Sequence, residues 1–394
     1  MQSDQEQSAS TDPQPRGFRI HVLEAGFAED GRTDLAVAVS EVECRSAAMF
    51  TRSRFAGASV LLSRTVAETG AAQGVVVVSR NANVATGAQG ARDAVEVREL
   101  AGRLVGVPPE RLLISSTGVI GRRYPMSTVR ARLAAASAAG SVGQWSDFAN
   151  TIMTTDTTAK LVRASVGPAS IVGVAKGVGM IEPNMATMLT YFFTDAELDQ
   201  QVLTETFRSV VEVSFNALSI DSDTSTSDTA VLLANGLAGP VDPAEFRAAL
   251  LRLARELVVR IARDGEGASK LLTVRVTGAR DRDQAKRVGK SVINSPLVKT
   301  AVHGSDPNWG RVVMAVGKCQ DDLDIDQEVV RVEMCGMRVY PEQCDEPELE
   351  RLRALMDADT VPISIDLGIG EAEFTVYGCD LSEGYVRLNS SYTT

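Results

Sequence analysis

The chain has 394 residues, which is enough for two or three domains with a substantial buried core. Apolar residues make up 44% of it and charged residues 23%, a balance that excludes a disordered, collagenous or fibrous protein. The net charge is −11, and the acidic residues are spread along the whole sequence. We therefore expect no nucleic-acid partner, because phosphate binding requires a basic face.

Residues 1–16 are polar and rich in Gln, Ser and Pro, which predicts a disordered tail. This tail lacks the basic-then-apolar order of a signal peptide. The longest uncharged run, residues 133–146, has 14 residues and is rich in Ala and Ser, so it is too short and too polar to cross a bilayer. These features predict a soluble, cytoplasmic protein with no membrane partner.

From residue 17 onward, short apolar runs alternate with helical patterns. The runs predict strands at 58–63, 74–79, 112–116, 170–175, 188–193, 230–234, 273–277, 329–334 and 373–378. Helical periodicity predicts helices at 91–105, 126–138, 205–217 and 243–263. Strands mixed with helices indicate an α/β or α+β architecture. The turn residues of LAGPVDP near residue 240 predict a boundary between regions 17–240 and 241–394.

Cysteine and histidine are scarce in ways that limit the chemistry. The five cysteines form no CxxC pair, which argues against a disulfide framework and against a zinc site. The two histidines, His21 and His303, do not lie beside a nucleophile elbow, and His303 in its Gly/Pro/Asn loop is more typical of a structural role. The run SDTSTSD (222–228) favours local hydroxyl hydrogen bonds over a metal site. An acyl-transfer enzyme with this composition would need a base other than histidine.

The most unusual segment is 175–195, AKGVGMIEPNMATMLTYFFTD. Its Gly-rich turn lacks the order of a phosphate-binding loop, and its spacing alone is typical of a turn before a buried strand. Thr187 stands where that turn meets the strand. Threonine becomes an effective nucleophile when cleavage before it frees its own α-amine to act as base. Such an amine titrates near pH ~7.7–8.0, close to working pH, and needs no histidine.

The segment KGVGMIEPNMATMLTYFFTDA closely resembles the signature of the ornithine acetyltransferase (glutamate N-acetyltransferase) family. The resemblance extends from about Gly17 to Thr394. Its further motifs are TRSRFAG (51–57), RNANVATG (80–87), SSTGVIG (115–121), IMTTDT (152–157), NALSIDSDTSTSDT (216–229), DGEGA (264–268), NSPLVKTAVHGSDPNWGR (294–311) and the C-terminal YVRLNSSYTT. The resemblance implies a layered αββα-type sandwich, of the ornithine acetyltransferase/aminopeptidase type, with a smaller C-terminal α/β region.

The resemblance also implies self-cleavage between Ala186 and Thr187, giving chains 1–186 and 187–394 that assemble as a heterotetramer of two α and two β chains. Thr187 would accept the acetyl group of N-acetylornithine and pass it to glutamate, yielding ornithine and N-acetylglutamate with no cofactor and no metal. The oxyanion of this reaction would be held at Thr117 and Gly118, a strand-end turn where backbone N–H groups can be exposed. The substrate contacts carried over from the family are Thr154, Lys176, Glu266, Asn389 and Thr394.

Other interpretations stay open from the sequence. An amidase or aminopeptidase of the same fold would pass the acyl group to water, and a non-catalytic amino-acid-binding protein would keep the scaffold alone. The sequence does not distinguish enzymes that also use acetyl-CoA as donor, nor arginine biosynthesis from a specialised pathway. Glu182 stands where family members commonly have a small residue or His. We expect it either to hold the turn or to favour a cationic substrate.

Overall fold

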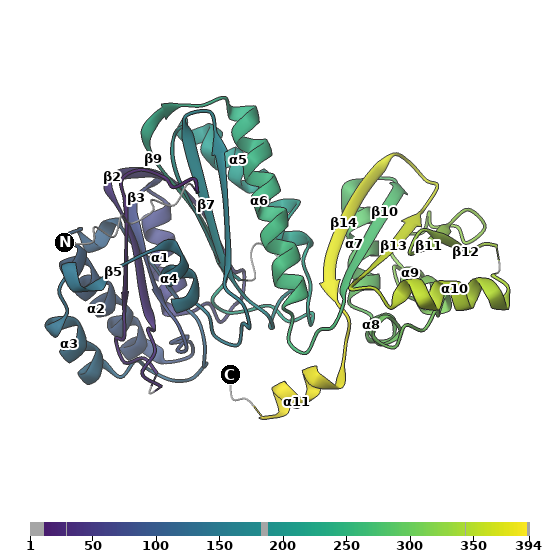
Figure 1. Cartoon of the computed structure of the whole chain (residues 1–394), viewed down its shortest axis with the longest axis horizontal. Coiled ribbons are helices and arrows are strands. Elements are labelled where there is room, and N and C mark those ends of the chain that lie inside the picture. The colour runs from purple at the N-terminus through teal and green to yellow at the C-terminus, as the bar shows by residue number, and fades with distance from the viewer. Residues whose placement is uncertain (1–11, 29, 183–187, 343, 392–394) are drawn as a thin grey trace, which may run out of the picture.

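The structure is a computed structural model that describes residues 12–28, 30–182, 188–342 and 344–391. In these residues the strands form two sheets (Figure 1). The first has nine strands in the order β4-β3-β2-β9-β8-β7-β6, with β1 paired to β2 and β5 paired to β1. The second has five strands in the order β12-β11-β13-β10-β14. Strands of both sheets alternate with helices along the chain, as the sequence predicts.

The strands of the first sheet are β1 (Phe18–Leu23), β2 (Leu35–Phe50), β3 (Ala71–Val78), β4 (Leu112–Ser116), β5 (Val142–Gly143), β6 (Lys160–Val166), β7 (Ala169–Lys176), β8 (Leu189–Glu197) and β9 (Thr229–Pro240). Those of the second are β10 (Leu271–Ala279), β11 (Arg331–Met334), β12 (Met337–Tyr340), β13 (Thr360–Asp366) and β14 (Ala372–Cys379). The α-helices are α1 (Ala58–Ala67), α2 (Gly87–Val105), α3 (Met126–Ala135), α4 (Trp145–Thr151), α5 (Gln200–Glu212), α6 (Pro243–Arg263), α7 (Arg282–Ile293), α8 (Pro296–His303), α9 (Trp309–Gly317), α10 (Glu346–Met356) and α11 (Glu383–Ser391).

One expected strand is wrong: residues 58–63 lie in helix α1. The buried side chains of this helix are Ser59, Val60, Ser63 and Val66, which recur at helical spacing only when the serines are counted with the apolar residues. Ser63 serves as an inward residue because its hydroxyl bonds to both the carbonyl and the N–H of Ile114 in β4, each at 2.7 Å. A short apolar run by itself does not separate a strand from a helix.

The long strand β2 folds the first sheet over on itself. Its register against β3 shifts between Val39 and Cys44, and its second half pairs with β9 instead of β1. The two halves of the sheet then face each other across one core, in which Val75 and Val77 of β3 lie with Tyr191 and Phe193 of β8. Sheet residues that alternate with these point outward to the helices.

Helices close both outer faces of this double layer. α2 and α3 share a core with the outer side of β3 and β4, and α5 and α6 cover the outer side of β7 to β9 (Figure 1). The order helix, sheet, sheet, helix is the αββα-type sandwich that the resemblance implies, and the second sheet with its own core is the smaller α/β region. The expected fold class is confirmed.

Helix α6 matches its expected range of 243–263, with Asp242 as its N-cap accepting from the N–H groups of Ala244 and Glu245. It follows the boundary expected near residue 240, yet it packs in the core of the first sheet, and the second sheet begins only at Leu271. The division of the chain into domains stays a prediction. Helix α6, which follows the predicted boundary, packs with the first sheet.

The last helix returns from the second sheet to the first. α11 follows β14 and runs back beneath the end of α6, apart from the other helices of the second sheet (Figure 1). Among the described residues, no helix is long and apolar enough to span a membrane.

Candidate active site

A cavity of about 450 Å³ lies where β7, β8 and β9 come together at one end of the first sheet. Lys176 ends β7, pairs in register with Leu189 at the start of β8, and Leu189 pairs with Thr229 at the start of β9. The described residues that the resemblance assigns to the site all line this cavity: Thr117, Gly118, Thr154, Lys176, Glu266 and Asn389. Ala186, Thr187 and Thr394 lie outside the described residues, while Met188 and Leu189 are part of the wall.

The turn after β4 brings Thr117 and Gly118 to the cavity. The N–H of Thr117 donates to the carbonyl of Val78 at 2.9 Å, which continues the β3–β4 ladder, so this N–H is not free to bind an oxyanion. The expectation of two exposed backbone donors is therefore corrected to one, Gly118, because the strand pairing extends one residue further than the turn suggests. The hydroxyl of Thr117 remains as a side-chain donor on the cavity wall, 3.4 Å from the ammonium of Lys176.

Gly118 is required at its position for steric reasons. Its φ of +127° is a conformation that L side chains rarely adopt. A Cβ there would lie 2.1 Å from the carbonyl carbon of Arg80, in the neighbouring turn after β3. The close approach of the two turns fixes the direction of the Gly118 N–H, which has no acceptor among the described residues.

The ammonium of Lys176 is the cation of the cavity. It donates to the hydroxyl of Thr154 at 2.6 Å and lies 3.9 Å from the carboxylate of Asp156. Burial lowers the pKa of Lys176, and the charge of Asp156 acts in the opposite direction without outweighing it. Thr154 is held in turn by its N–H, which donates to Asp156 at 3.1 Å. A lysine and a hydroxyl presented together suit the recognition of a carboxylate.

A buried ion-pair network lies directly behind Lys176. The ammonium of Lys160, which is fully buried, bonds to Asp156 at 2.8 Å and to Asp264 at 2.6 Å. Asp156 also accepts from the N–H of Gly177 at 2.7 Å. Burial acts to raise the pKa of Asp156, but the charges of Lys176 and Lys160 outweigh it and hold that pKa below its ordinary value. This network joins the loop after α4, the end of β7 and the end of α6.

Glu266 also lines the cavity and follows Asp264 of this network by two residues. Its carboxylate accepts from the hydroxyl of Thr155 at 3.0 Å and from the amide of Asn389 at 2.9 Å. Its N–H donates to the carbonyl of Val178 at 2.8 Å. A Cβ on Gly179 would come within 2.6 Å of the Glu266 carboxylate, so the glycine is what gives this carboxylate its space.

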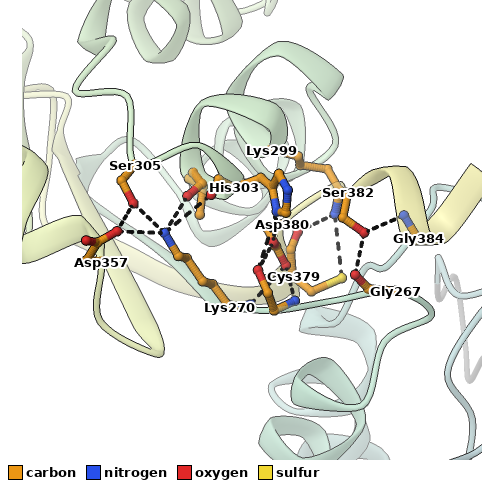
Figure 2. A network of polar contacts seen from close by, with 12 residues as sticks. Gly267, Lys270, Lys299, His303, Ser305, Asp357, Cys379, Asp380, Ser382 and Gly384 are labelled. Atoms are coloured by element: carbon orange, nitrogen blue, oxygen red, sulfur yellow. Dashed lines mark hydrogen bonds and ion pairs between the residues drawn. The ribbon is translucent and has the colours of Figure 1, made fainter.

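The residues just before the C-terminal helix α11 are anchored to the loop before β10 and to the end of α8 (Figure 2). Asp380 accepts from the N–H groups of Ser269 and Lys270, at 2.8 and 3.0 Å, and from Nδ1 of His303 at 2.8 Å. Just beyond it, the hydroxyl of Ser382 donates to the carbonyl of Gly267 at 2.5 Å. His303 thus lies in an anchoring network and not on the cavity wall, which agrees with the structural role expected for it.

Three groups on the cavity wall were not expected from the sequence: Asp221, Tyr385 and the segment 223–228. Asp221 accepts from the N–H groups of Met180 and Ile181, at 2.6 and 2.8 Å, and lies 3.4 Å from the hydroxyl of Tyr385. The sequence signal for the segment is its run of hydroxyl residues directly before the buried strand β9, a pattern that by itself favours local turn formation.

Glu182 does not line the cavity. Its carboxylate lies 3.2 Å from the ammonium of Lys290 in α7, and its carbonyl accepts from the hydroxyl of Thr224 at 3.1 Å. Of the two roles expected for Glu182, this geometry favours holding the turn over selecting a cationic substrate.

Comparison with known proteins identifies the family. The sequence profile of the ArgJ family matches residues 19–394. The chain belongs to the ArgJ family.

Curated relatives match over nearly their whole length. Glutamate N-acetyltransferase Oat2 of Streptomyces clavuligerus is 57% identical over 392 residues, which cover 98% of this chain and 100% of that protein. The arginine biosynthesis bifunctional protein ArgJ of Rhodococcoides fascians is 49% identical over 387 residues, which cover 96% of this chain and 94% of that protein. The solved structure of the arginine biosynthesis bifunctional protein ArgJ from Bacillus halodurans is 37% identical, with a TM-score of 0.47, and covers 50% of this chain and 96% of that one.

The cavity of this ArgJ-family chain combines groups suited to acyl transfer. It offers a cation with a neighbouring hydroxyl, the carboxylate of Glu266, and an N–H and a hydroxyl donor at the end of β4. Neither histidine lines it. Among the described residues, no group of three or more His, Cys, Asp or Glu side chains could hold a metal ion.

Proposed function

We propose that this ArgJ-family chain is a glutamate N-acetyltransferase that moves the acetyl group of N-acetylornithine to glutamate through an acetyl-Thr187 intermediate. The observation that carries the proposal is that one cavity gathers the six described residues assigned to the reaction, from segments as far apart as Thr117 and Asn389. The wall of the cavity continues through Met188, the residue that follows Thr187 in the chain. The near full-length similarity to glutamate N-acetyltransferase Oat2 supports the same activity.

Each substrate carries an α-carboxylate, for which Lys176 and Thr154 are the binding groups. Lys176 supplies the charge, and the hydroxyl of Thr154, 2.6 Å from it, supplies a second donor. Glu266, in the same cavity, is the partner of a substrate ammonium group, and Asn389 holds its carboxylate in place at 2.9 Å. A cation and a carboxylate at separate points of one cavity orient an amino acid along one direction, so that its acyl nitrogen is presented at a fixed position.

The chemistry requires self-cleavage at Ala186–Thr187, which frees the α-amine of Thr187. The hydroxyl of Thr187 then attacks the acetyl carbon while the α-amine takes its proton. The hydroxyl of Thr117 and the N–H of Gly118 stabilise the oxyanion. As the C–N bond breaks, the α-ammonium gives the proton to the departing nitrogen, and ornithine leaves. Glutamate then attacks the acetyl ester in the reverse sequence of steps and leaves as N-acetylglutamate.

Further parts of the proposal follow from the family resemblance. The two cleaved chains stay together, because β8 begins just after the cleavage site and pairs with β7 from the first chain and β9 from the second. We propose that they assemble as a heterotetramer of two α and two β chains in the cytoplasm and act in arginine biosynthesis. Use of acetyl-CoA as an additional donor would make the enzyme bifunctional.

The test is a transfer assay with N-acetylornithine that carries a deuterated acetyl group. With glutamate present, we expect labelled N-acetylglutamate and ornithine in equal amounts. Without glutamate, we expect about one equivalent of ornithine and one acetyl group added to the 187–394 chain. Release of labelled acetate as the main product would favour the amidase alternative, and binding without turnover would favour the non-catalytic one. Thr187→Ala is the control for background reaction.

A further inference from the structure

The C-terminal helix α11 brings Tyr385 and Asn389 to the cavity wall without packing into a core. None of the side chains of its nine residues, Glu383–Ser391, is buried. Among the described residues, two hydrogen bonds join its side chains to the rest of the chain, from Tyr385 to Asp221 at 3.4 Å and from Asn389 to Glu266 at 2.9 Å. Because a helix is normally fixed by packing of its apolar face, the position of α11 must be set by other contacts.

The link between β14 and α11 is bonded to the loop that carries Glu266 (Figure 2). One oxygen of Asp380 in this link accepts from the N–H groups of Ser269 and Lys270, at 2.8 and 3.0 Å. Its other oxygen accepts from the hydroxyl of Ser269 at 2.5 Å and from Nδ1 of His303 at 2.8 Å. One carboxylate therefore joins the end of β14, the loop of Glu266 and the end of α8.

The first turn of α11 lies directly against Gly267 of the same loop. Gly267 has a φ of +69°, and a Cβ on it would lie 2.3 Å from the backbone nitrogen of Tyr385. Its carbonyl accepts from the hydroxyl of Ser382 at 2.5 Å. The loop therefore contacts α11 at its start through Gly267 and near its far end through Glu266 and Asn389.

The hydrogen bond between His303 and Asp380 has a charged acceptor. The side chain of Asp380 is fully buried, whereas 39% of that of His303 is exposed. Burial acts to raise the pKa of Asp380, but hydrogen bonds from Ser269, Lys270 and His303 outweigh it and hold that pKa below its ordinary value. The carboxylate is therefore ionised at neutral pH, and Nδ1 of His303 carries the hydrogen. Without the imidazole, a buried carboxylate would lack a donor, a costly state that movement of the link toward solvent would relieve.

We propose that His303 is a positioning residue for acetyl transfer, which acts through Asp380 to hold α11 so that Asn389 reaches Glu266. This inference rests on the proposed function, in which Glu266 is the partner of a substrate ammonium group. Asn389 lies six residues beyond Glu383, the start of α11, which places it about 9 Å along the helix axis. A tilt of about 10° at that start would move Asn389 by about 1.5 Å, enough to break its hydrogen bond with Glu266.

The test compares His303→Leu with the parent chain in steady-state kinetics, with N-acetylornithine varied at saturating glutamate. Leucine removes the donor to Asp380, so we expect KM to rise about 10-fold, the effect of losing one hydrogen bond to a charged group. We expect kcat to stay within about 2-fold, because a contact made equally in the ground state and the transition state affects KM alone. A smaller folded fraction would instead lower the apparent kcat at unchanged KM.

Two further variants of helix α8 are the controls. His303→Asn places an amide nitrogen at the same number of bonds from the backbone as Nδ1, so it keeps a donor for Asp380 and should restore the parent KM. Ser295→Ala removes the N-cap of α8, which accepts from the N–H of Val298 at the other end of the helix. It should lower the thermal midpoint at unchanged KM.

Trypsin gives a measurement that does not depend on the reaction. Arg387 is exposed in α11, and cleavage after it, which removes residues 388–394, requires the helix to open or to move away. We expect this cleavage, followed by intact mass, to be about 10-fold faster in His303→Leu than in the parent chain, His303→Asn or Ser295→Ala.

The outcomes separate this role from the proposed function. A KM that rises in His303→Leu and returns with His303→Asn supports the positioning role. A parental KM in folded His303→Leu overturns it, and so does an equal rise in Ser295→Ala.

If the parent chain transfers no acetyl group from N-acetylornithine, the proposed function fails and the trypsin rates decide how α11 is held. Faster cleavage in His303→Leu alone then supports the link from His303 to α11, and equal rates in the parent and the variants overturn it. Should His303→Leu not fold, His303→Ala is measured in its place, because alanine is well tolerated at a half-exposed helix position.

Discussion

The carboxylate of Glu182 lies 3.2 Å from the ammonium of Lys290 and so ties the segment before the proposed cleavage site to helix α7 of the second sheet. Both side chains are largely shielded, with 23% and 12% of their surface exposed. Lys290 also donates to the carbonyl of Leu218 at 2.6 Å. The described segment that ends at Glu182 is therefore held by a contact between two residues that are 108 positions apart in the chain.

Glu182→Ala should destabilise the fold by roughly 1–3 kcal/mol, because it leaves the shielded ammonium of Lys290 without its charged partner. Urea unfolding measures this change. Glu350→Ala, which breaks the exposed pair with Arg353 on α10, is the control and should cost at most about 1 kcal/mol. The KM for N-acetylornithine should stay unchanged, since Glu182 is not on the cavity wall. A change in substrate preference at unchanged stability would contradict the turn-holding role.

The lowered pKa of Lys290 should make the free energy of unfolding rise with pH. Burial lowers its pKa to about 8, whereas an unfolded lysine titrates near ~10.4. Between these values the unfolded chain binds more protons than the folded one, so the free energy of unfolding increases as pH rises. The parent chain should gain up to about 3 kcal/mol relative to Lys290→Met between pH 8 and 10. Urea unfolding of both proteins at several pH values checks this, and a constant difference between them would contradict it.

Lys160→Met should be severely destabilising. It removes the cation shared by Asp156 and Asp264 and leaves two buried carboxylates short of their partner, a loss of about 3–5 kcal/mol for pairs of this kind. Arg353→Met, in the exposed pair on α10, should change stability by less than about 1 kcal/mol. Guanidinium unfolding of the two variants gives the comparison, and equal losses would show that the buried network contributes no more than a surface pair.

Thr117→Val should lower kcat by about 10²–10³-fold with little change in thermal midpoint, since it removes the proposed side-chain donor to the oxyanion but keeps the shape. Thr117→Ser retains the hydroxyl and should keep most of the activity. Steady-state kinetics of acetyl transfer to glutamate separate the two variants. Equal rates for valine and serine would assign the oxyanion to other donors.

Local patterns predicted the strands well where apolar runs were long and buried, as at 112–116, which is β4 without change of bounds. They failed at 58–63, where Ser59 and Ser63 are buried residues of a helix that a hydrophobic pattern does not count. The layered sandwich followed from the family motifs, and no single run of residues predicts the register shift in β2 between Val39 and Cys44 that folds the sheet over.

The residues of the candidate site also fall into those that the sequence predicted and those that only the structure reveals. Thr117, Lys176 and Glu266 came from family motifs, and the structure brings them to one cavity. The ion pair of Lys160 with Asp264 behind these residues could not be predicted from the sequence. It joins residues 104 positions apart and depends on how α6 packs against β6. Asp228 was not expected because it stands in a run of hydroxyl residues, and only the structure shows that its Oδ2 is buried with no hydrogen-bond partner among the described residues.

The proposed mechanism requires a break at Ala186–Thr187, and the intact mass of the purified protein under denaturing conditions tests for this break directly. We expect two chains with the masses of residues 1–186 and 187–394, and a single full-length chain from Thr187→Ala. A single full-length chain from the parent protein, folded and purified in the same way, would contradict the N-terminal nucleophile and leave an amino-acid-binding role in its place.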